Sequence, residues 1–266
     1  MRKINNFYPT LGESWMLMGI LLVCTLIGGF PAALLKLFVP SLSSLGFLLS
    51  YVLSFVLLIG FIILYRANAY SASEDTATVE KRPDNALFLL LLVMTPCLSV
   101  LTEPLSSWIP YPSWFDFEAL MKNIIKTDVP SFLSVAVFAP VCEEWLFRGT
   151  ILKGLLKHGK PWNAILWSAF MFGLIHFNPW QGIPAIGLGI FFGWVYWRTG
   201  SLLLCIFMHF VNNGMAFLLL HLYPDADTMA DLLGNGYPYA LVIAASVVLI
   251  SGFFLYKKTG TNATIP

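Results

Sequence analysis

Residues 140–149, which read Pro-Val-Cys-Glu-Glu-Trp-Leu-Phe-Arg-Gly, place two carboxylates and a guanidinium in an otherwise apolar run. Each charged group inside a membrane costs about 3 kcal/mol or more unless it is paired or hydrated. On a helix, Glu144 and Arg148 lie four residues apart and share a face, with the acid N-terminal to the base, which favours an ion pair. Glu143 is rotated about 100° away and fits the same partner less well. We therefore predict a structural role for Glu144 and Arg148 and an available carboxylate at Glu143. In the alternative, both acids only neutralise Arg148 or cap a helix near the membrane surface.

Three further polar side chains stand in apolar segments, namely His176, His209 and Asn213. His209 and Asn213 are four residues apart and share a helix face, and Phe172 precedes His176 by the same spacing, which puts its ring beside the imidazole. Counted from the inner ends of their predicted helices, Glu143 and His176 lie about 21 Å deep, Asn213 about 18 Å and His209 about 12 Å. An acid, two imidazoles and an amide at neighbouring depths on three helices are what a catalytic pocket requires. For each histidine alone, an interhelical hydrogen bond is the alternative.

These side-chain types support hydrolysis. A carboxylate in apolar surroundings, here Glu143, is suited to take a proton from water, and His176 can share or orient that water. His209 and Asn213 can donate hydrogen bonds to the oxyanion of a tetrahedral intermediate, each worth about 3 kcal/mol. Cys142 adjoins Glu143, but neighbouring helix residues point in different directions, so we do not expect it to act as the nucleophile.

The composition excludes an ordinary soluble domain. Of the 266 residues, 58% are hydrophobic and 11% are charged, whereas soluble domains average about 25% charged residues. The formal net charge of +1 is not gathered in a basic patch, so we expect no nucleic-acid partner. The 4 cysteines stand singly in apolar segments, which indicates buried thiols rather than a disulfide framework or a zinc knuckle.

Hydropathy predicts an all-α polytopic membrane bundle that forms a single domain over residues 1–266. About 20 apolar residues span a bilayer, and on this criterion we count about eight transmembrane helices. They cover residues 14–37, 45–65, 86–105, 130–157, 162–178, 182–198, 201–221 and 237–256. The fifth and sixth are short and joined by a tight turn at 178–181. In the sixth, Gly189 and Gly193 form a small-xxx-small pair, which predicts close packing against a neighbouring helix.

Lysine and arginine residues predict that both termini are cytoplasmic. With this orientation, all of the 15 basic residues except Lys36, Lys122 and Lys126 fall in cytoplasmic segments, as the positive-inside rule requires. We therefore expect a multi-pass protein of the cytoplasmic (inner) membrane of a prokaryote, with the lipid bilayer as its surroundings.

The three motifs resemble those of the CPBP family, which contains CAAX proteases and bacteriocin-processing enzymes and is also called the ABI family. Residues 143–148 look like its EExxxR motif, 172–176 like its FxxxH motif and 209–213 like its HxxxN motif, in the same order. Each motif is short, but three in order on successive apolar helices form a specific signal. The resemblance covers residues 130–217, the predicted catalytic core, while the first half of the chain matches only as generic membrane helices.

The resemblance implies an intramembrane endopeptidase of the glutamate type. At the matching positions, Glu143 and His176 activate water, and His209 and Asn213 stabilise the oxyanion. The remaining motif residues hold the site together. The substrate implied is a membrane-associated peptide or protein, either a prenylated CAAX protein or a signal- or bacteriocin-type precursor.

Two alternatives stay open. Glu143, His176 and His209 are a reasonable zinc ligand set, although the HExxH spacing is absent and Asn213 is a poor zinc ligand. In that version the same hydrolase depends on zinc; otherwise we expect no metal and no cofactor. The second alternative is a non-catalytic membrane scaffold or immunity protein, whose polar cluster binds a partner helix or carries protons.

Overall fold

The structure is a computed structural model that describes residues 8–69, 83–110, 112, 125–226 and 228–260. Every regular element in these ranges is helical, which confirms the predicted all-α class. The first elements are α1 (Leu11–Gly28), α2 (Phe30–Phe38), η1 (Pro40–Leu42), α3 (Ser43–Ala69), α4 (Asn85–Thr102) and η2 (Glu103–Trp108). The others are α6 (Val129–Phe132), η3 (Leu133–Phe138), α7 (Ala139–Glu144), η4 (Trp145–Leu152), α8 (Lys153–Leu155), α9 (Pro161–Leu174), α10 (Pro179–Thr199), α11 (Leu202–Leu222), α12 (Met229–Leu233), η5 (Gly234–Gly236) and α13 (Tyr237–Thr259).

Within the described part of the chain, 6 helical segments are long and apolar enough to cross a membrane. They are Leu11–Phe38, Pro40–Ala69, Asn85–Ser106, Val129–Leu155, Leu202–Leu222 and Met229–Thr259. The remaining two of the eight expected helices, α9 and α10, do not meet this criterion. With 14 residues, α9 is only about 21 Å long, which is shorter than the hydrocarbon core. The protein is therefore an integral multi-pass membrane bundle, and eight full crossings stay a prediction.

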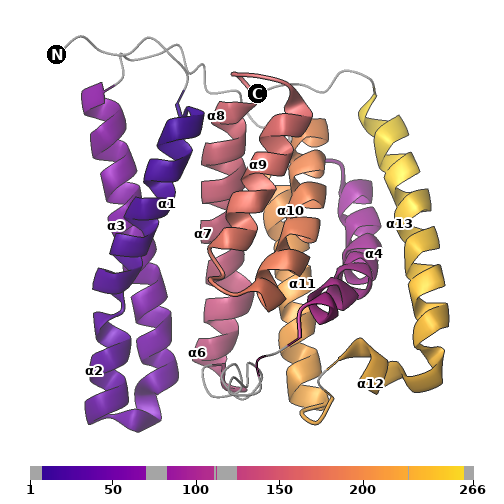
Figure 1. Cartoon of the computed structure of the whole chain (residues 1–266), viewed down its shortest axis with the longest axis horizontal. Coiled ribbons are helices and arrows are strands. Elements are labelled where there is room, and N and C mark those ends of the chain that lie inside the picture. The colour runs from indigo at the N-terminus through magenta and orange to yellow at the C-terminus, as the bar shows by residue number, and fades with distance from the viewer. Residues whose placement is uncertain (1–7, 70–82, 111, 113–124, 227, 261–266) are drawn as a thin grey trace.

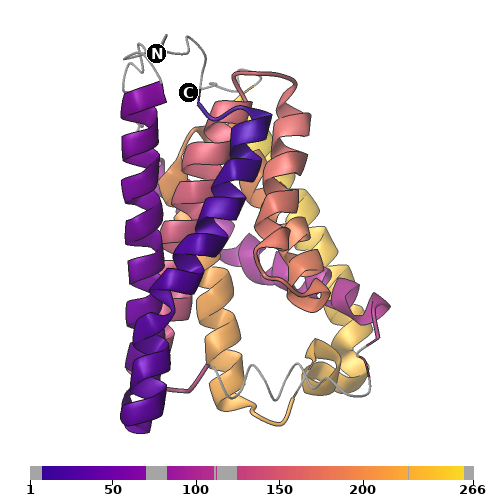
Figure 2. The same cartoon turned by 60° about the vertical axis from the view of Figure 1, so that its left-hand side comes forward.

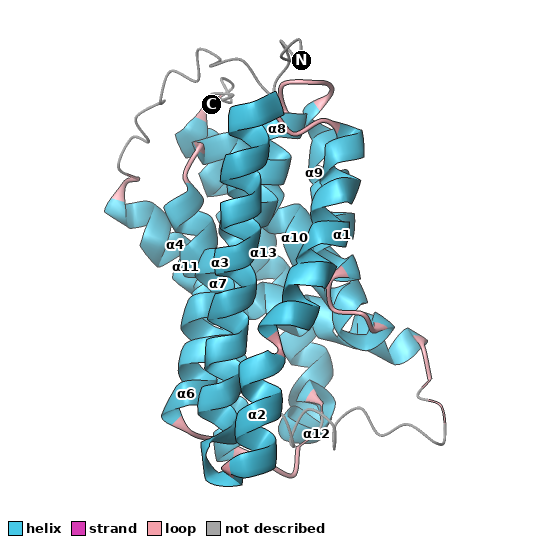
Figure 3. Ribbon diagram, turned by 90° about the vertical axis from the view of Figure 1, so that its left-hand side faces the viewer, coloured by secondary structure: helices cyan, strands magenta, loops and turns pink. Residues whose placement is uncertain are grey.

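The long helices stand side by side (Figure 1). Helices α1 to α3 form one flank and α13 the opposite flank, with α7, α9, α10 and α11 between them. Turned by 60°, the bundle shows α1 with α2 running beside α3 (Figure 2), and Figure 3 views the same flank face on. Helix α1 begins and α13 ends at the same end of the bundle, while the α9–α10 turn lies near half its height (Figure 1). This arrangement agrees with two termini on one side, although which side is cytoplasmic stays a prediction.

Two clusters of buried apolar side chains hold the bundle together. The first joins α1 and α3 to η4 and α9 and contains Leu17, Leu58, Ile151 and Ile165. The second joins α4, α10, α11 and α13 and contains Leu91, Phe192, Leu204 and Leu255. Large apolar side chains such as those of Leu26, Leu64 and Leu249 are exposed. In a bilayer these side chains would face acyl chains, which are as apolar as leucine itself.

The helix that carries the two adjacent glutamates was expected to run unbroken over 130–157. It is continuous from Val129 to Leu155, but it contains two π-helical stretches, η3 and η4, on either side of α7. At the end of η3 the Ala139 N–H donates to the Ser134 carbonyl, five residues earlier. The next residue, Pro140, has no N–H, and its ring would clash with the carbonyl four residues before it in an α-helix. The wider winding relieves that clash, and such π-bulges are frequent at functional sites.

Close packing of α9 against α10 depends on glycine, as the small-xxx-small pair predicted. A methyl group on Gly189 would lie 3.1 Å from Ala169 Cα, and one on Gly193 would lie 3.1 Å from Ile165 Cγ2. The contact is tighter still near the turn, where a methyl group on Gly173 would lie 2.6 Å from the Gly182 carbonyl oxygen. The two backbones therefore meet directly, which fixes the position of the turn between them.

Candidate active site

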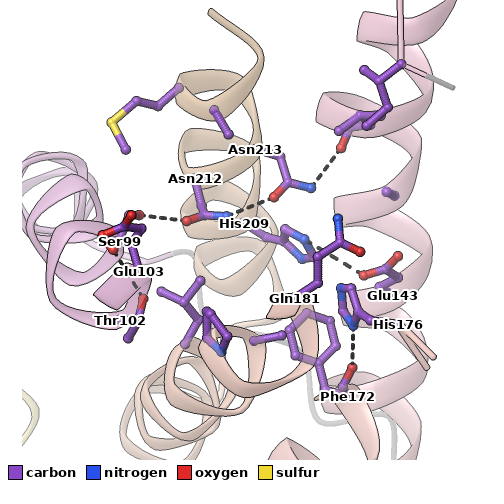
Figure 4. Close-up of a pocket in the computed structure, with 18 of the residues that line it drawn as sticks. Ser99, Thr102, Glu103, Glu143, Phe172, His176, Gln181, His209, Asn212 and Asn213 are labelled. Carbon is purple, nitrogen blue, oxygen red and sulfur yellow. Dashed lines mark hydrogen bonds and ion pairs between the residues drawn. The ribbon is translucent and has the colours of Figure 1, made fainter. Parts of the chain in front are cut away.

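A cavity of about 520 Å³ lies inside the bundle, with its walls formed by α3, α4, η3, α7, α9, α10 and α11. Its lining includes all four residues predicted to carry the chemistry, Glu143, His176, His209 and Asn213, together with Phe172. Figure 4 shows these side chains around one space. The apolar part of the wall includes Val135, Leu188, Phe192 and Leu219. The structure therefore gathers the predicted residues from three motifs, while their catalytic roles stay a prediction.

The ion pair predicted from the Glu144 and Arg148 spacing is present and fully buried. Arg148 Nη1 lies 2.8 Å from Glu144 Oε1, and both side chains have an exposed fraction of 0%. Arg148 Nη2 donates to the Gly189 carbonyl at 3.1 Å, and the guanidinium carbon lies 4.6 Å from the centre of the Phe172 ring. The pair thus ties α7 and η4 to α9 and α10. Removing one partner of such a pair leaves an uncompensated buried charge.

His209 bridges the two glutamates. Its Nδ1 lies 2.8 Å from Glu144 Oε1, and its Nε2 lies 3.9 Å from Glu143 Oε2. A carboxylate can only accept hydrogen bonds, so the Nδ1 of His209 carries the proton that it donates to Glu144. The ring edge bearing Nε2 is therefore the one presented to Glu143 and the cavity.

Glu143 borders the cavity, with an exposed side-chain fraction of 13%. Its Oε1 accepts a hydrogen bond from Tyr51 Oη at 2.8 Å. Tyr51 belongs to α3, 92 positions away in the chain, and no sequence pattern predicted its contact with Glu143. The available signal was a hydroxyl within an apolar helix, but no local spacing connected it to Glu143. The first half of the chain thus contributes directly to the site.

His176 lies at the C-terminal end of α9, in the turn that leads to α10. Its Nδ1 lies 3.0 Å from the Phe172 carbonyl oxygen, so Nδ1 donates and Nε2 is left as an acceptor. The Phe172 ring meets the His176 ring edge-on at 5.5 Å, as the four-residue spacing predicts. The next residue, Phe177, has a φ of 54°, a left-handed conformation that is rare for a bulky side chain.

The Asn178 side chain stabilises this turn through two hydrogen bonds. Its side-chain Oδ1 accepts from the Gln181 N–H at 2.8 Å, which caps α10. Its Nδ2 donates to the His176 carbonyl at 2.8 Å. The same amide therefore caps the N-terminus of α10 and fixes the backbone of His176. The position of the His176 imidazole thus depends on this strained turn.

The Asn213 amide is oriented by a chain of polar groups that no sequence motif predicted. Asn213 Nδ2 donates to the Val135 carbonyl at 2.9 Å, and its Oδ1 accepts from Asn212 Nδ2 at 2.9 Å. Asn212 Oδ1 accepts in turn from Ser99 Oγ at 2.7 Å. An amide nitrogen has two hydrogens, so Asn213 has one left after binding Val135. Ser99 and Asn212 were detectable only as polar residues in apolar helices.

The described residues contain no group of three or more histidine, cysteine, aspartate or glutamate side chains arranged to hold a metal ion. The Nδ1 atoms of His176 and His209 are engaged by the Phe172 carbonyl and by Glu144. The metal-free site stays a prediction.

Comparisons with known proteins agree with the motifs. A family model described as "Type II CAAX prenyl endopeptidase Rce1-like" matches residues 125–215. The "Membrane-embedded CAAX protease MroQ" of Staphylococcus aureus (strain USA300) is 30% identical over 111 residues, which are 39% of this chain and 44% of that protein. Among solved structures, none matches significantly. Both matches are to CAAX proteases, and the matched family segment contains every motif residue around the cavity. These matches support the resemblance of residues 125–215 to the CAAX-type intramembrane proteases of the CPBP family.

Proposed function

We propose that the protein is a metal-independent intramembrane endopeptidase in which Glu143 and His176 activate water, and His209 and Asn213 stabilise the oxyanion. One observation carries this proposal: the four side chains, from three separate helical segments, line a single cavity within an apolar bundle. Polar groups at this depth are costly and are typical of functional sites. The similarity of residues 125–215 to CAAX proteases supports hydrolysis over a purely structural cluster.

The two oxygens of the Glu143 carboxylate have different neighbours, and this difference supports a role in activating water. Tyr51 occupies Oε1, whereas Oε2 lies 3.9 Å from His209 Nε2, beyond direct hydrogen-bonding distance. A water molecule bound to Oε2 gives its proton to Glu143 as its oxygen attacks the peptide carbonyl carbon. His176 presents Nε2 as an acceptor and orients this water. The proton then passes from Glu143 to the departing amine as the carbon–nitrogen bond breaks.

The developing oxyanion needs hydrogen-bond donors. Asn213 supplies its second amide hydrogen, and His209 supplies Nε2–H when its ring is protonated. Protonated His209 also balances the charges, because Glu143 and Glu144 carry two negative charges against one positive charge on Arg148. Each such donor contributes about 3 kcal/mol to stabilising the transition state. Glu144, Arg148 and Phe172 hold these groups in place.

The substrate class proposed is a peptide or protein held at the membrane, either a prenylated CAAX protein or a signal- or bacteriocin-type precursor. The apolar wall of the cavity would accommodate an apolar segment beside the peptide bond. The lipid surroundings proposed are those of the cytoplasmic membrane of a prokaryote, and the matched relative is bacterial.

Comparative mass spectrometry of membrane peptides tests the proposal. Membranes containing wild-type protein are compared with membranes containing Glu143→Gln, which preserves size and removes the base. We expect at least one membrane peptide to be cleaved only with the wild-type protein, which also identifies the bond. Identical peptide sets, with both proteins folded and equally abundant, would contradict the proposal and favour the scaffold or immunity protein.

Measuring the metal content of the protein distinguishes the proposed metal-independent mechanism from the zinc-dependent alternative. The proposal expects wild-type protein treated with a chelator to keep its cleavage rate. If the purified protein instead binds one zinc ion per chain, and both zinc and activity disappear in Glu143→Gln, the zinc-dependent version replaces the metal-free mechanism.

A further inference from the structure

Tyr51 reaches the site from α3, outside the residues 125–215 that match the family model. We propose that Tyr51 is a positioning residue for Glu143: its hydroxyl holds one carboxylate oxygen and thereby reserves the other for water. This inference rests on the proposed role of Glu143 as the base, and it adds a part of the chain that no family motif includes.

The direction of the hydrogen bond is fixed by the chemistry of the two groups. An ionised carboxylate only accepts, so Tyr51 Oη donates to Glu143 Oε1 across 2.8 Å. Hydrogen bonds to a charged group are roughly twice as strong as neutral ones. The Tyr51 ring is held in turn by Phe55, at 5.1 Å between ring centres and 32° between planes. The donor is thus fixed before the bond forms.

This bond gives the two carboxylate oxygens different surroundings. Oε1 is occupied by Tyr51, whereas Oε2 faces His209 Nε2 at 3.9 Å. A glutamate side chain has several rotatable bonds, and a catalytic group works only within about 0.5 Å of its productive position. Without Tyr51, rotation of the carboxylate would exchange or misplace the oxygen that binds water.

Several other groups act on Glu143 and must be kept constant in any test. His176 lines the same cavity, and His209 joins Glu143 to the buried Glu144–Arg148 pair. Cys142 is the neighbouring residue on the same helix. A variant that removes only the Tyr51 hydroxyl leaves all of them in place.

The same helix provides a matched control. Tyr65, also on α3, donates from Oη to Glu13 Oε1 at 3.0 Å. Neither Tyr65 nor Glu13 lines the cavity. Tyr65→Phe therefore removes a tyrosine–glutamate hydrogen bond of similar length without touching the site.

Infrared spectroscopy tests the inference without a substrate. Full-length wild-type, Tyr51→Phe, Tyr65→Phe and Glu143→Gln proteins are compared in lipid nanodiscs at one pH, and the carboxylate stretching band absent from Glu143→Gln is assigned to Glu143. The frequency of this band depends on the hydrogen bonds that the carboxylate oxygens accept, so we expect the band to shift in Tyr51→Phe. Tyr65→Phe should retain the wild-type frequency. Equal frequencies in folded Tyr51→Phe and wild-type protein would overturn the inference.

A second variant covers the case in which Tyr51→Phe does not fold. A ring-fluorinated tyrosine at position 51 keeps the shape of the side chain and makes its hydroxyl a stronger donor. The Glu143 carboxylate band should then shift away from its wild-type frequency, and an unchanged band would again overturn the inference.

Kinetics on the peptide identified by mass spectrometry separate positioning from substrate binding. We expect Tyr51→Phe to lower kcat about tenfold and to change KM less than about twofold, with Tyr65→Phe like wild type. A changed KM with unchanged kcat would contradict positioning. If Glu143→Gln still cleaves, the proposed function fails, whereas the infrared result on Tyr51 stands on its own.

Discussion

The two adjacent glutamates have different surroundings because His209 stands between them. Glu144 is fully buried and accepts from both Arg148 and His209, whereas Glu143 borders the cavity and accepts from Tyr51. Consecutive helix residues point about 100° apart, so one acid can complete a buried ion pair while its neighbour faces the cavity. The spacing of Glu144 and Arg148 predicted this pair from the sequence. It could not predict Tyr51, because no helical periodicity joins residues so far apart in the chain.

Removing Arg148 should destabilise the protein severely. Arg148→Ala leaves Glu144 buried without its guanidinium partner, and we expect a loss of about 3–5 kcal/mol in the free energy of unfolding, measured by denaturant titration in detergent. Lys258→Ala is the control, because the Lys258 and Asp84 side chains are 41% and 55% exposed. Exposed pairs contribute little, so this variant should unfold like wild type. Similar stability of both variants would show that the buried pair is not structural.

Ser99 should affect catalysis through Asn212 and Asn213. Ser99→Ala removes the donor that orients the Asn212 amide, so the Asn213 amide, the proposed oxyanion donor, is held less firmly. We expect kcat to fall about three- to tenfold, the equivalent of one neutral hydrogen bond, with KM unchanged. Ser246→Ala is the control, because Ser246 Oγ donates only to the Val242 carbonyl on the exposed side of α13. Equal kcat values for both variants would argue against an orienting chain.

Two irregular elements position the site, and the sequence showed them only in part. Periodicity identified the helix from Val129 to Leu155, but not its π-helical stretches, because hydropathy does not reveal which carbonyl accepts each N–H. The α9–α10 turn was recognisable from its Asn-Pro pair. Its strained Phe177 and the Asn178 bond to the His176 carbonyl depend on the close approach of two helices, which a single segment cannot show.

Gly173 should be essential for the position of His176. A methyl group there would lie 2.6 Å from the Gly182 carbonyl oxygen, so Gly173→Ala must push α9 and α10 apart. We expect overpacking to cost about 1–3 kcal/mol of stability and to lower cleavage activity more than tenfold, because His176 follows three residues later. Gly252→Ala in α13 is the control, since nothing lies within 4 Å of the added methyl group. Thermal unfolding and cleavage assays compare the two. Wild-type activity in Gly173→Ala would show that the turn tolerates displacement.

At the scale of the whole molecule, the sequence predicted an apolar helical bundle and a catalytic core in its second half. The bundle is confirmed, but only 6 helical segments in the described ranges have spanning length and apolarity. The hydropathy count includes α9 and α10 as crossings, and eight full crossings stay a prediction. The helices that precede the catalytic core also form part of the cavity, because Tyr51 of α3 and Ser99 of α4 line it.

The predicted orientation can be measured by cysteine labelling. In a variant without the four native cysteines, Gly159→Cys places a single exposed thiol between α8 and α9, and Pro224→Cys places one just after the end of α11. These two helix ends lie at opposite ends of the bundle (Figure 1). If both termini are cytoplasmic, a membrane-impermeant maleimide should label position 224 in intact cells and position 159 only after permeabilisation. The reverse pattern would invert the topology, and labelling of both positions in intact cells would contradict the bundle itself.

The most direct test of the central claim is the cleavage rate of purified protein in liposomes, with metal removed by a chelator. The substrate is the peptide identified in wild-type membranes, and the variants are Glu143→Gln, His176→Ala and the Tyr65→Phe control. Loss of a general base or of its partner should lower the rate about 10²- to 10⁴-fold, while Tyr65→Phe and wild type cleave equally without metal. Cleavage at the wild-type rate by folded Glu143→Gln would contradict the claim that this cavity performs the hydrolysis.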